Sequence, residues 1–328
     1  MALPRKGLVH LYKSSGWDRL TAFEHTPHFP QTPPQNLLIF IGGLFDGLLT
    51  IPYTSTLSSA LPATWTLAEV RLSSSYTGWG TSSLQKDVSE LSDCVSYFRG
   101  IKTGKIVLMG SSTGCQDIME YLTGADHASR PAIDGGILQA PASDREALIL
   151  EMDLELYKSS CEAAQRMVDE GNGEEILPQR EKGAAFPAPC TARRWLSLAS
   201  PNHDGDDDYF SSDLGDERLL KTFGKLPKQS PLCILMSEMD EYVPKSVDKK
   251  GVIGRWVSII KKGKGILDEV NSGVVPGASH NLMKDGDDVV GDLVGRVVGF
   301  LEGLPEKATL KELDEKLRSQ ATSVNLSS

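Results

Sequence analysis

A serine framed by two glycines is the first feature of this chain that could do chemistry. The letters GSSTG at residues 110–114 place Ser112 two positions from each glycine, in a G-x-S-x-G pattern. An apolar run at residues 105–109 precedes the pattern, and a helix-compatible stretch at residues 115–122 follows it. This order predicts a strand, a tight turn and a helix, with the serine hydroxyl raised at the apex of the turn. The glycines let the backbone reverse there without a Cβ clash. We therefore predict that Ser112 is a nucleophile.

A serine hydroxyl needs a base to take its proton and a carboxylate to orient that base. Of the six histidines, His280 alone lies just beyond a late predicted strand, on a loop that contains Gly and Ser. Asp240 follows the predicted strand at residues 231–236, so the chain order is serine, acid, histidine, which is typical of one hydrolase arrangement. Asp240 is preferred over Glu238 and Glu241 because an Asp-x-x-Val-Pro turn begins at it. The alternatives are a solvated turn for the acidic stretch and a surface or packed residue for the histidine.

Negative charge that develops on the substrate oxygen also needs hydrogen-bond donors. The usual donors are the backbone N–H after the nucleophile and one from the loop after an early strand, which here are Thr113 and Leu44. The glycine pair at residues 42–43 would let that loop approach the oxyanion, although it also suits an ordinary tight turn. Cys115 is a rival nucleophile, but we expect it to lie inside the helix as a packing residue.

The elements that must position these residues alternate along the chain. Strands are predicted at residues 8–12, 20–23, 36–41, 64–72, 105–109, 133–138, 231–236 and 267–275. Helices are predicted at residues 82–98, 115–122, 148–168 (as one or two), 254–260 and 287–301. We expect the first two strands to form an antiparallel hairpin and the rest to form a mostly parallel central sheet covered by helices on both faces. Three glycines, spaced four apart at residues 291, 295 and 299, predict a smooth helix face that packs closely on the sheet.

The alternation lapses over residues 143–226, which we interpret as a lid or cap insertion over the sheet. This segment holds 18 Asp plus Glu against 10 Lys plus Arg, a net of −8 out of the −10 of the whole chain. Such charge would attract a cationic or amine-bearing substrate, or would only keep the surface solvated. A calcium-binding loop starting at Asp204 is excluded, because Tyr209 and Gly215 stand where Gly and Glu are required. Residues 305–328 are predicted to be a short terminal helix with a frayed tail.

Composition excludes several classes of function. The chain of 328 residues carries a net charge of −10 without a basic run, which argues against a nucleic-acid partner. No secretory signal and no apolar stretch of about 20 residues is apparent, so we expect no membrane partner. The five cysteines are scattered without a C-x-x-C pair, which favours free thiols in a reducing cytoplasm over disulfides or a metal site. The sequence makes no prediction of the oligomeric state.

Several stretches resemble the fungal intracellular siderophore esterases of the SidJ type, which are α/β-hydrolases that cleave the ester bonds of fusarinine C. The resemblance implies a single α/β-hydrolase domain over residues 1–328, with Ser112 as nucleophile, Asp240 as orienting acid and His280 as base. It also implies that iron belongs to the substrate rather than to the enzyme. Fusarinine C carries free amines, which would suit an acidic lid. The matching stretches cover most of the chain and lie at residues 41–53, 73–87, 110–117, 139–146, 209–214, 237–244 and 275–282.

The sequence therefore predicts a serine esterase with no cofactor and no metal, acting on a small-molecule ester such as a ferric or desferri hydroxamate siderophore. His280 would take the proton of Ser112, an acyl-enzyme would form with its oxyanion bound by the amides of Leu44 and Thr113, and water would release the acid. A carboxylesterase or thioesterase of other specificity is an alternative, because the triad does not define the acyl group. Another is a catalytically silent hydrolase fold that serves as a binding protein.

Overall fold

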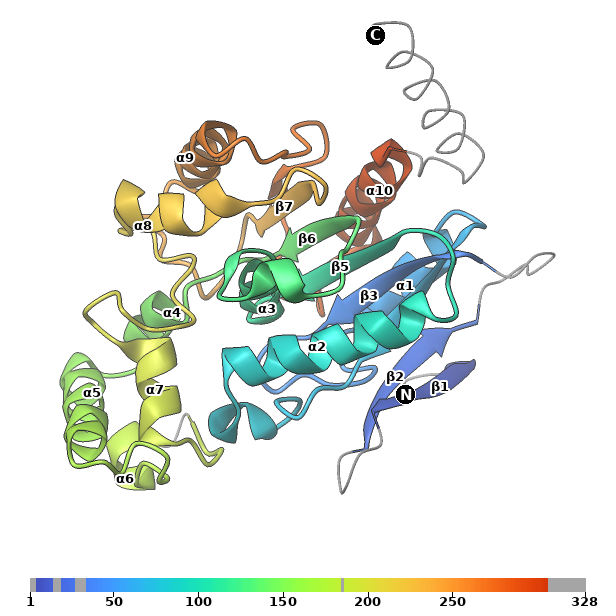
Figure 1. The fold of residues 1–328 in the computed structure, drawn as a ribbon. Coiled ribbons are helices and arrows are strands. Elements are labelled where there is room, and N and C mark those ends of the chain that lie inside the picture. Colours follow the sequence, from blue (N-terminus) through green and yellow to red (C-terminus); the bar gives the residue numbers. More distant parts are fainter. Residues whose placement is uncertain (1–3, 14–18, 27–33, 184–185, 306–328) are drawn as a thin grey trace, which may run out of the picture.

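A twisted sheet runs through the centre of the protein in the computed structural model, which describes residues 4–13, 19–26, 34–183 and 186–305 (Figure 1). Within these residues it has eight strands in the order β1-β2-β4-β3-β5-β6-β7-β8. The first two strands form the predicted antiparallel hairpin, β2 also runs antiparallel to β4, and every other pair is parallel. The strands are β1 (Gly7–Lys13), β2 (Leu20–His25), β3 (Asn36–Ile41), β4 (Trp65–Val70), β5 (Ile106–Ser111), β6 (Gly135–Gln139), β7 (Leu232–Ser237) and β8 (Gly273–Val275).

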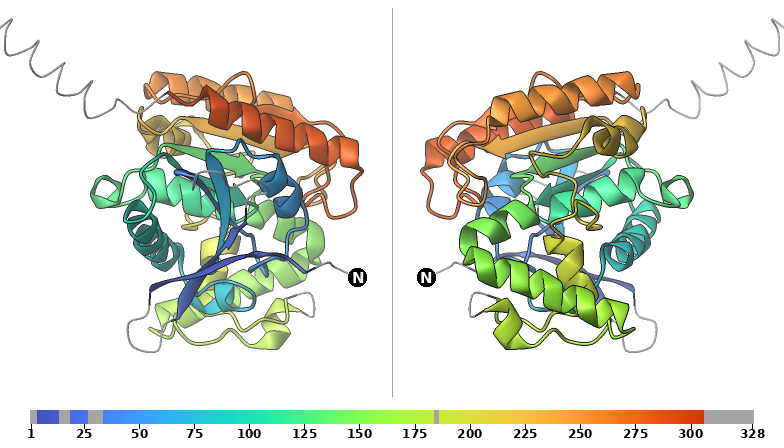
Figure 2. Two further views of the ribbon diagram at one scale, coloured as in Figure 1. Left: turned by 90° about the vertical axis from the view of Figure 1, so that its right-hand side faces the viewer. Right: turned by 90° about the vertical axis from the view of Figure 1, so that its left-hand side faces the viewer.

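Continuous apolar strands lie at the centre because both of their faces are covered. In β3, Leu37 and Ile39 point into one hydrophobic cluster, whereas Leu38 and Phe40 point into a second cluster on the opposite face. The first cluster lies under α2 (Leu84–Arg99), α3 (Gly114–Thr123) and α9 (Lys249–Lys262). The second lies under α1 (Tyr53–Ala60) and α10 (Asp287–Gly303), and Figure 2 shows the sheet between these two helical layers. The predicted α/β class, with a mostly parallel sheet covered on both faces, is confirmed.

The segment between β6 and β7 forms a separate group of helices beside the carboxyl ends of the central strands, except for its last helix, α8 (Asp216–Lys221), which lies next to α9 (Figure 1). The apolar stretch at residues 148–168 is two helices, because Asp153 starts a new one by accepting the N–H groups of Glu155 and Leu156. A third hydrophobic cluster fills the space between these helices, whereas Tyr209 and Phe223, later in the segment, belong to the first cluster. The helices are α4 (Asp144–Glu151), α5 (Leu154–Asp169), α6 (Gln179–Lys182), α7 (Ala192–Ala199) and α8 (Asp216–Lys221).

Two predictions about the C-terminal half are wrong in part. The strand expected at residues 267–275 shrinks to β8, because the Asp268 carboxylate accepts the N–H groups of Val270 and Asn271 and closes a turn there. In α10, a Cβ added at Gly291 or Gly295 would meet no heavy atom within 4 Å, so the glycine face does not pack on the sheet. The buried face is apolar instead and consists of Leu293, Val294, Val297, Phe300 and Leu301. The predicted terminal helix lies outside the described residues.

All five cysteines are free and buried. Cys94, Cys115 and Cys233 lie in α2, α3 and β7, whereas Cys161 and Cys190 lie in the segment between β6 and β7. Burial raises the pKa of each thiol above its ordinary value. Across the part of the chain that the structure describes, no group of His, Cys, Asp and Glu is arranged to hold a metal ion. In that same part no helix has the length and apolar character needed to cross a membrane.

Candidate active site

The predicted nucleophile lies on a sharp turn between β5 and α3. Ser112 follows directly after β5 and has a backbone φ of 54°, a left-handed conformation that is unusual for a residue with a side chain. The turn is held by two backbone hydrogen bonds, from the Ser112 N–H to the Gln139 oxygen at 3.0 Å and from the Cys115 N–H to the Ser112 oxygen at 2.8 Å. Helix α3 begins at Gly114, so Ser112 stands at the positive end of its dipole.

The two glycines of the motif are required by close approach of the backbone. A Cβ on Gly110 would lie 2.1 Å from the backbone oxygen of Gly114, and a Cβ on Gly114 would lie 2.5 Å from the oxygen of Ile41. Both distances are far shorter than any real carbon contact. Strand β5 and helix α3 therefore pack against each other, and against β3, only because these positions have no side chain.

The predicted base and acid contact each other directly. His280 follows β8 and Asp240 follows β7, and both side chains are buried. Nδ1 of His280 lies 2.9 Å from each carboxylate oxygen of Asp240. An ionised carboxylate can only accept, so Nδ1 carries the proton and Nε2 is left free to act as a base. The His280 N–H donates to Glu241 at 2.9 Å, which fixes the backbone beside the imidazole.

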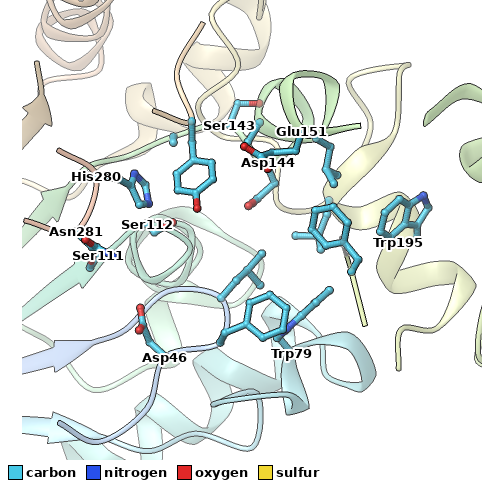
Figure 3. Close-up of a pocket in the computed structure, with 18 residues that line it drawn as sticks. Asp46, Trp79, Ser111, Ser112, Ser143, Asp144, Glu151, Trp195, His280 and Asn281 are labelled. Atoms are coloured by element: carbon cyan, nitrogen blue, oxygen red, sulfur yellow. The ribbon is translucent and has the colours of Figure 1, made fainter. Parts of the chain in front are cut away.

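Ser112 and His280 line the same cavity, which has a volume of about 260 Å³ (Figure 3). No hydrogen bond between them is present among the described residues. Catalytic serine–histidine bonds are often long without substrate and shorten when the reacting complex forms. The carboxylate of Glu241 accepts the backbone N–H of His280 and that of Glu238 accepts the N–H of Gly277. Among the described residues, Asp240 is therefore the acid that bonds to the imidazole.

The two predicted oxyanion donors come from two different segments near the nucleophile. Thr113 is the next residue, and Leu44 belongs to the loop that follows β3 and lines the same cavity. Among the residues that the structure describes, neither backbone N–H donates a hydrogen bond, so both remain available to a ligand. The loop is held in place by Asp46, whose carboxylate accepts the Gly43 N–H at 3.0 Å and the Thr50 hydroxyl at 2.9 Å.

The cavity has aromatic walls and an acidic lining. Trp79 and Trp195 lie across from His280 in Figure 3, and the second of them comes from α7 of the helical segment. Asp46, Asp144 and Glu151 are also lining residues, and none of the described residues that line the cavity is Lys or Arg. The lining therefore offers a ligand oxygen acceptors and no cationic side chain from the described residues.

Helix α4 supplies two of these carboxyl groups. Asp144 and Glu151 are seven positions apart, with Ala147 and Leu148 between them on the same helix face, and all four line the cavity. Burial raises the pKa of Asp144 to about 8, and the nearby carboxyl of Asp207 acts in the same direction. Burial likewise raises the pKa of Asp46. These carboxyl groups were not identified from the sequence, because the spacing of acids in a helix does not show which face meets a cavity.

An ion pair anchors the helical segment beside this cavity. Arg194 of α7 donates from Nη1 to Asp207 at 2.5 Å and from Nε to the backbone oxygen of Trp79 at 3.0 Å. All of these groups are buried. A buried guanidinium must keep its partners, because an unpaired charge would be costly there. The segment is therefore tied to the loop that carries Trp79.

Comparison with known proteins shows which family the chain matches. The family described as "Protein of unknown function (DUF1749)" matches residues 1–302. The chain is 36% identical over 346 residues to "Fusarinine C esterase sidJ" of Aspergillus fumigatus, covering 91% of this chain and 96% of that protein.

Two solved structures share the fold. "Siderophore hydrolase EstB from Aspergillus fumigatus" superposes with a TM-score of 0.79 at 35% identity, covering 93% of this chain and 99% of that one. An "Alpha/Beta hydrolase fold protein of unknown function" superposes with a TM-score of 0.62 at 17% identity, covering 92% and 97% of the two chains. The predicted fold class and the predicted resemblance are confirmed by these matches.

Proposed function

Because this chain belongs to the DUF1749 family and has the α/β-hydrolase fold, we propose that it is a serine esterase that hydrolyses the ester bonds of a hydroxamate siderophore. The observation that carries the proposal is the contact between His280 and Asp240 on the rim of the cavity that also exposes Ser112. Nucleophile, base and acid follow three different strands and converge at one edge of the sheet. This is the constellation that acyl transfer requires.

The chemistry follows from the geometry. His280 takes the proton of Ser112 while Oγ attacks the ester carbonyl, and the amides of Leu44 and Thr113 bind the oxygen that becomes negative. Asp240 keeps the imidazole in the correct tautomer and stabilises its protonated form. The alcohol leaves with the proton held by His280. A water molecule then gives a proton to the same nitrogen and attacks the acyl-enzyme. The acid is released as Ser112 Oγ takes this proton back from His280.

The substrate proposal rests on two kinds of support. Relatives over 30% identical that match almost the whole chain are named as a fusarinine C esterase and a siderophore hydrolase. The cavity lining of this chain adds separate support, because three carboxyl groups and no Lys or Arg among the described residues offer hydrogen-bond acceptors to an ester that carries protonated amines. In a siderophore esterase the iron, when present, arrives as part of the substrate.

We also place the protein in the cytoplasm. All five cysteines are free and buried rather than joined, which fits a reducing compartment. The lid role of residues 143–226 is part of the same proposal, since Trp195 and the acidic face of α4 come from that segment and border the cavity.

Mass spectrometry of purified protein tests the proposal. Fusarinine C, its acetylated form, simple acyl esters and a thioester are incubated with the wild type and with Ser112→Ala. We expect cleavage of fusarinine C by the wild type and none by the variant, together with a fluorophosphonate adduct on Ser112. Equal and slow turnover of every ester would reject the siderophore assignment. Preference for the thioester would identify a thioesterase, and binding without turnover or adduct would identify a silent binding protein.

A further inference from the structure

Gln139 contacts both halves of the candidate active site. It is the last residue of β6, is 1% exposed, and lies between β5 and β7 in the sheet. Its direct neighbour in β5 is Ser111, one residue before the nucleophile. The chain turns sharply after it, since Ala140 has a φ of 48°. Gln139 is therefore fixed at the point where the elbow and the histidine loop meet.

The backbone oxygen of Gln139 holds the elbow. It accepts the N–H of Ser112 at 3.0 Å and the thiol of Cys115 at 3.2 Å. A left-handed residue with a side chain persists only where surrounding contacts fix it. These two bonds are such contacts, and they come from the main chain, so they are retained whatever side chain residue 139 carries.

The side chain of Gln139 holds the loop of the base. Its Nε2 donates to the backbone oxygen of His280 at 2.9 Å, and its Oε1 accepts from the hydroxyls of Ser111 at 2.7 Å and Tyr53 at 2.9 Å. The amide orientation is not arbitrary. A backbone oxygen can only accept, so the nitrogen must face His280 and the oxygen must face the two hydroxyls.

We propose that Gln139 is a positioning residue that sets the distance between Ser112 Oγ and His280 Nε2. The inference rests on the proposed function of these two residues. Gln139 itself touches neither reacting atom, and it acts by linking the main chain of the elbow to the main chain of the histidine loop. The two linked residues are 168 positions apart in sequence, so local structure alone cannot keep them in register.

Gln139→Met tests the side-chain link, because methionine has a similar volume and no amide. We expect kcat to fall about 10- to 100-fold while KM changes less than about twofold, since misplacement of a catalytic group affects the reaction rather than binding. Thr66→Val is the matched control. Thr66 is also buried, and its replacement removes the hydrogen bonds of its hydroxyl with Glu24 and Lys102, but it lies near the amino end of β4, away from the site.

Gln139→Glu tests whether the donor to His280 is what matters. A buried carboxyl group has a raised pKa, so near neutral pH it is protonated and can donate its O–H to the His280 oxygen. Two titratable side chains contact residue 139 among the described residues, Tyr53 and Cys115, whereas His280 contacts it through its backbone oxygen. Burial raises the pKa of Tyr53 and of Cys115, so both stay neutral. We expect Gln139→Glu to retain most of kcat near neutral pH and to lose it at higher pH, with an alkaline limb that the wild type lacks.

A proton NMR measurement reports on the same link without turnover. The His280 Nδ1–H donated to Asp240 should give a low-field resonance that shifts or broadens in Gln139→Met and is unchanged in Thr66→Val. If the wild type hydrolysed no ester, the proposed function would fail, and this resonance would still decide the role of Gln139. The inference is overturned by an unmoved resonance, by equal kcat losses in Gln139→Met and Thr66→Val, or by identical pH profiles of Gln139→Glu and the wild type.

Discussion

Gly43 and Ser112 approach each other more closely than a side chain on residue 43 would allow. A Cβ at Gly43 would lie 2.7 Å from the Ser112 Cβ and 3.3 Å from its Oγ. The missing side chain brings the loop after β3 against the proposed nucleophile. The next residue is Leu44, whose N–H we propose as an oxyanion donor.

Gly43→Ala should therefore damage catalysis more than binding. The added methyl group pushes the loop away from Ser112, and loss of one oxyanion donor typically lowers kcat about 100-fold or more. Steady-state kinetics with a simple ester should show this fall with KM little changed. Gly254→Ala is the control, because a Cβ there meets no heavy atom within 4 Å. An undiminished kcat in Gly43→Ala would remove Leu44 from the mechanism.

Ser112→Gly and Ser112→Ala should both be inactive but should differ in stability. The φ of 54° at residue 112 is left-handed, which glycine adopts freely and alanine does not. We expect the glycine variant to have a free energy of unfolding higher than that of the alanine variant by about 1 kcal/mol. Urea denaturation of the two proteins measures the difference. Equal midpoints would show that the elbow carries no backbone strain.

Asp240→Asn should lower kcat on the order of 10⁴-fold. The amide can present a donor to His280 Nδ1, which favours the tautomer with its proton on Nε2 and leaves no base for Ser112. Glu238→Gln is the comparison, because the Glu238 carboxylate accepts the N–H of Gly277 and does not contact His280 among the described residues. It should retain activity within a few-fold of the wild type. A larger loss in Glu238→Gln than in Asp240→Asn would reassign the acid.

Asp144 should make stability depend on pH. Burial raises the pKa of Asp144 to about 8, whereas an exposed Asp titrates near about 4. The folded protein therefore keeps a proton that the unfolded chain releases, so this stabilisation is complete below about pH 4 and is lost as the pH rises toward 8.

The variant Asp144→Asn cannot ionise, and its free energy of unfolding should fall less than that of the wild type across this window. Urea denaturation at a series of pH values provides the measurement. The control is Glu170→Gln, an exposed change at the end of α5. Its free energy of unfolding should change with pH as steeply as that of the wild type. Parallel slopes for the wild type and Asp144→Asn would contradict the raised pKa.

The sequence was sufficient to predict elements that depend on neighbouring residues, and contacts that follow from the order of the strands. Strand β3 occupies the predicted residues 36–41, because an apolar run of that length between turns suits a strand buried on both faces. Helix α2 covers nearly all of the predicted residues 82–98, and the Ser83 hydroxyl caps its start by accepting the N–H of Lys86. The contact between Asp240 and His280 could also be anticipated, because both residues follow parallel strands and such ends meet at one edge of the sheet. Their catalytic role stays a prediction.

The sequence was insufficient to predict features that depend on contacts between residues far apart in the chain. Helix α7 has only eight residues within a proline-rich stretch, and it is stabilised by burial of Trp195 and Leu198 in the third cluster. The glycine face of α10 was misjudged because spacing shows which residues share a face but not which face is covered. No sequence pattern marked Gln139 as a linking residue, since the hydrogen-bond partners of its side chain lie 28, 86 and 141 positions away.

The buried thiols are distributed so that their labelling can report which part of the chain opens first. Cys94, Cys115 and Cys233 lie in the sheet or in the helices that cover it, whereas Cys161 lies in α5 and Cys190 just before α7. Alkylating reagents react with thiolates, so each cysteine is protected until its surroundings open. The order in which the five thiols become labelled in mild denaturant therefore shows whether the helices between β6 and β7 open before the sheet does, without the introduction of any probe.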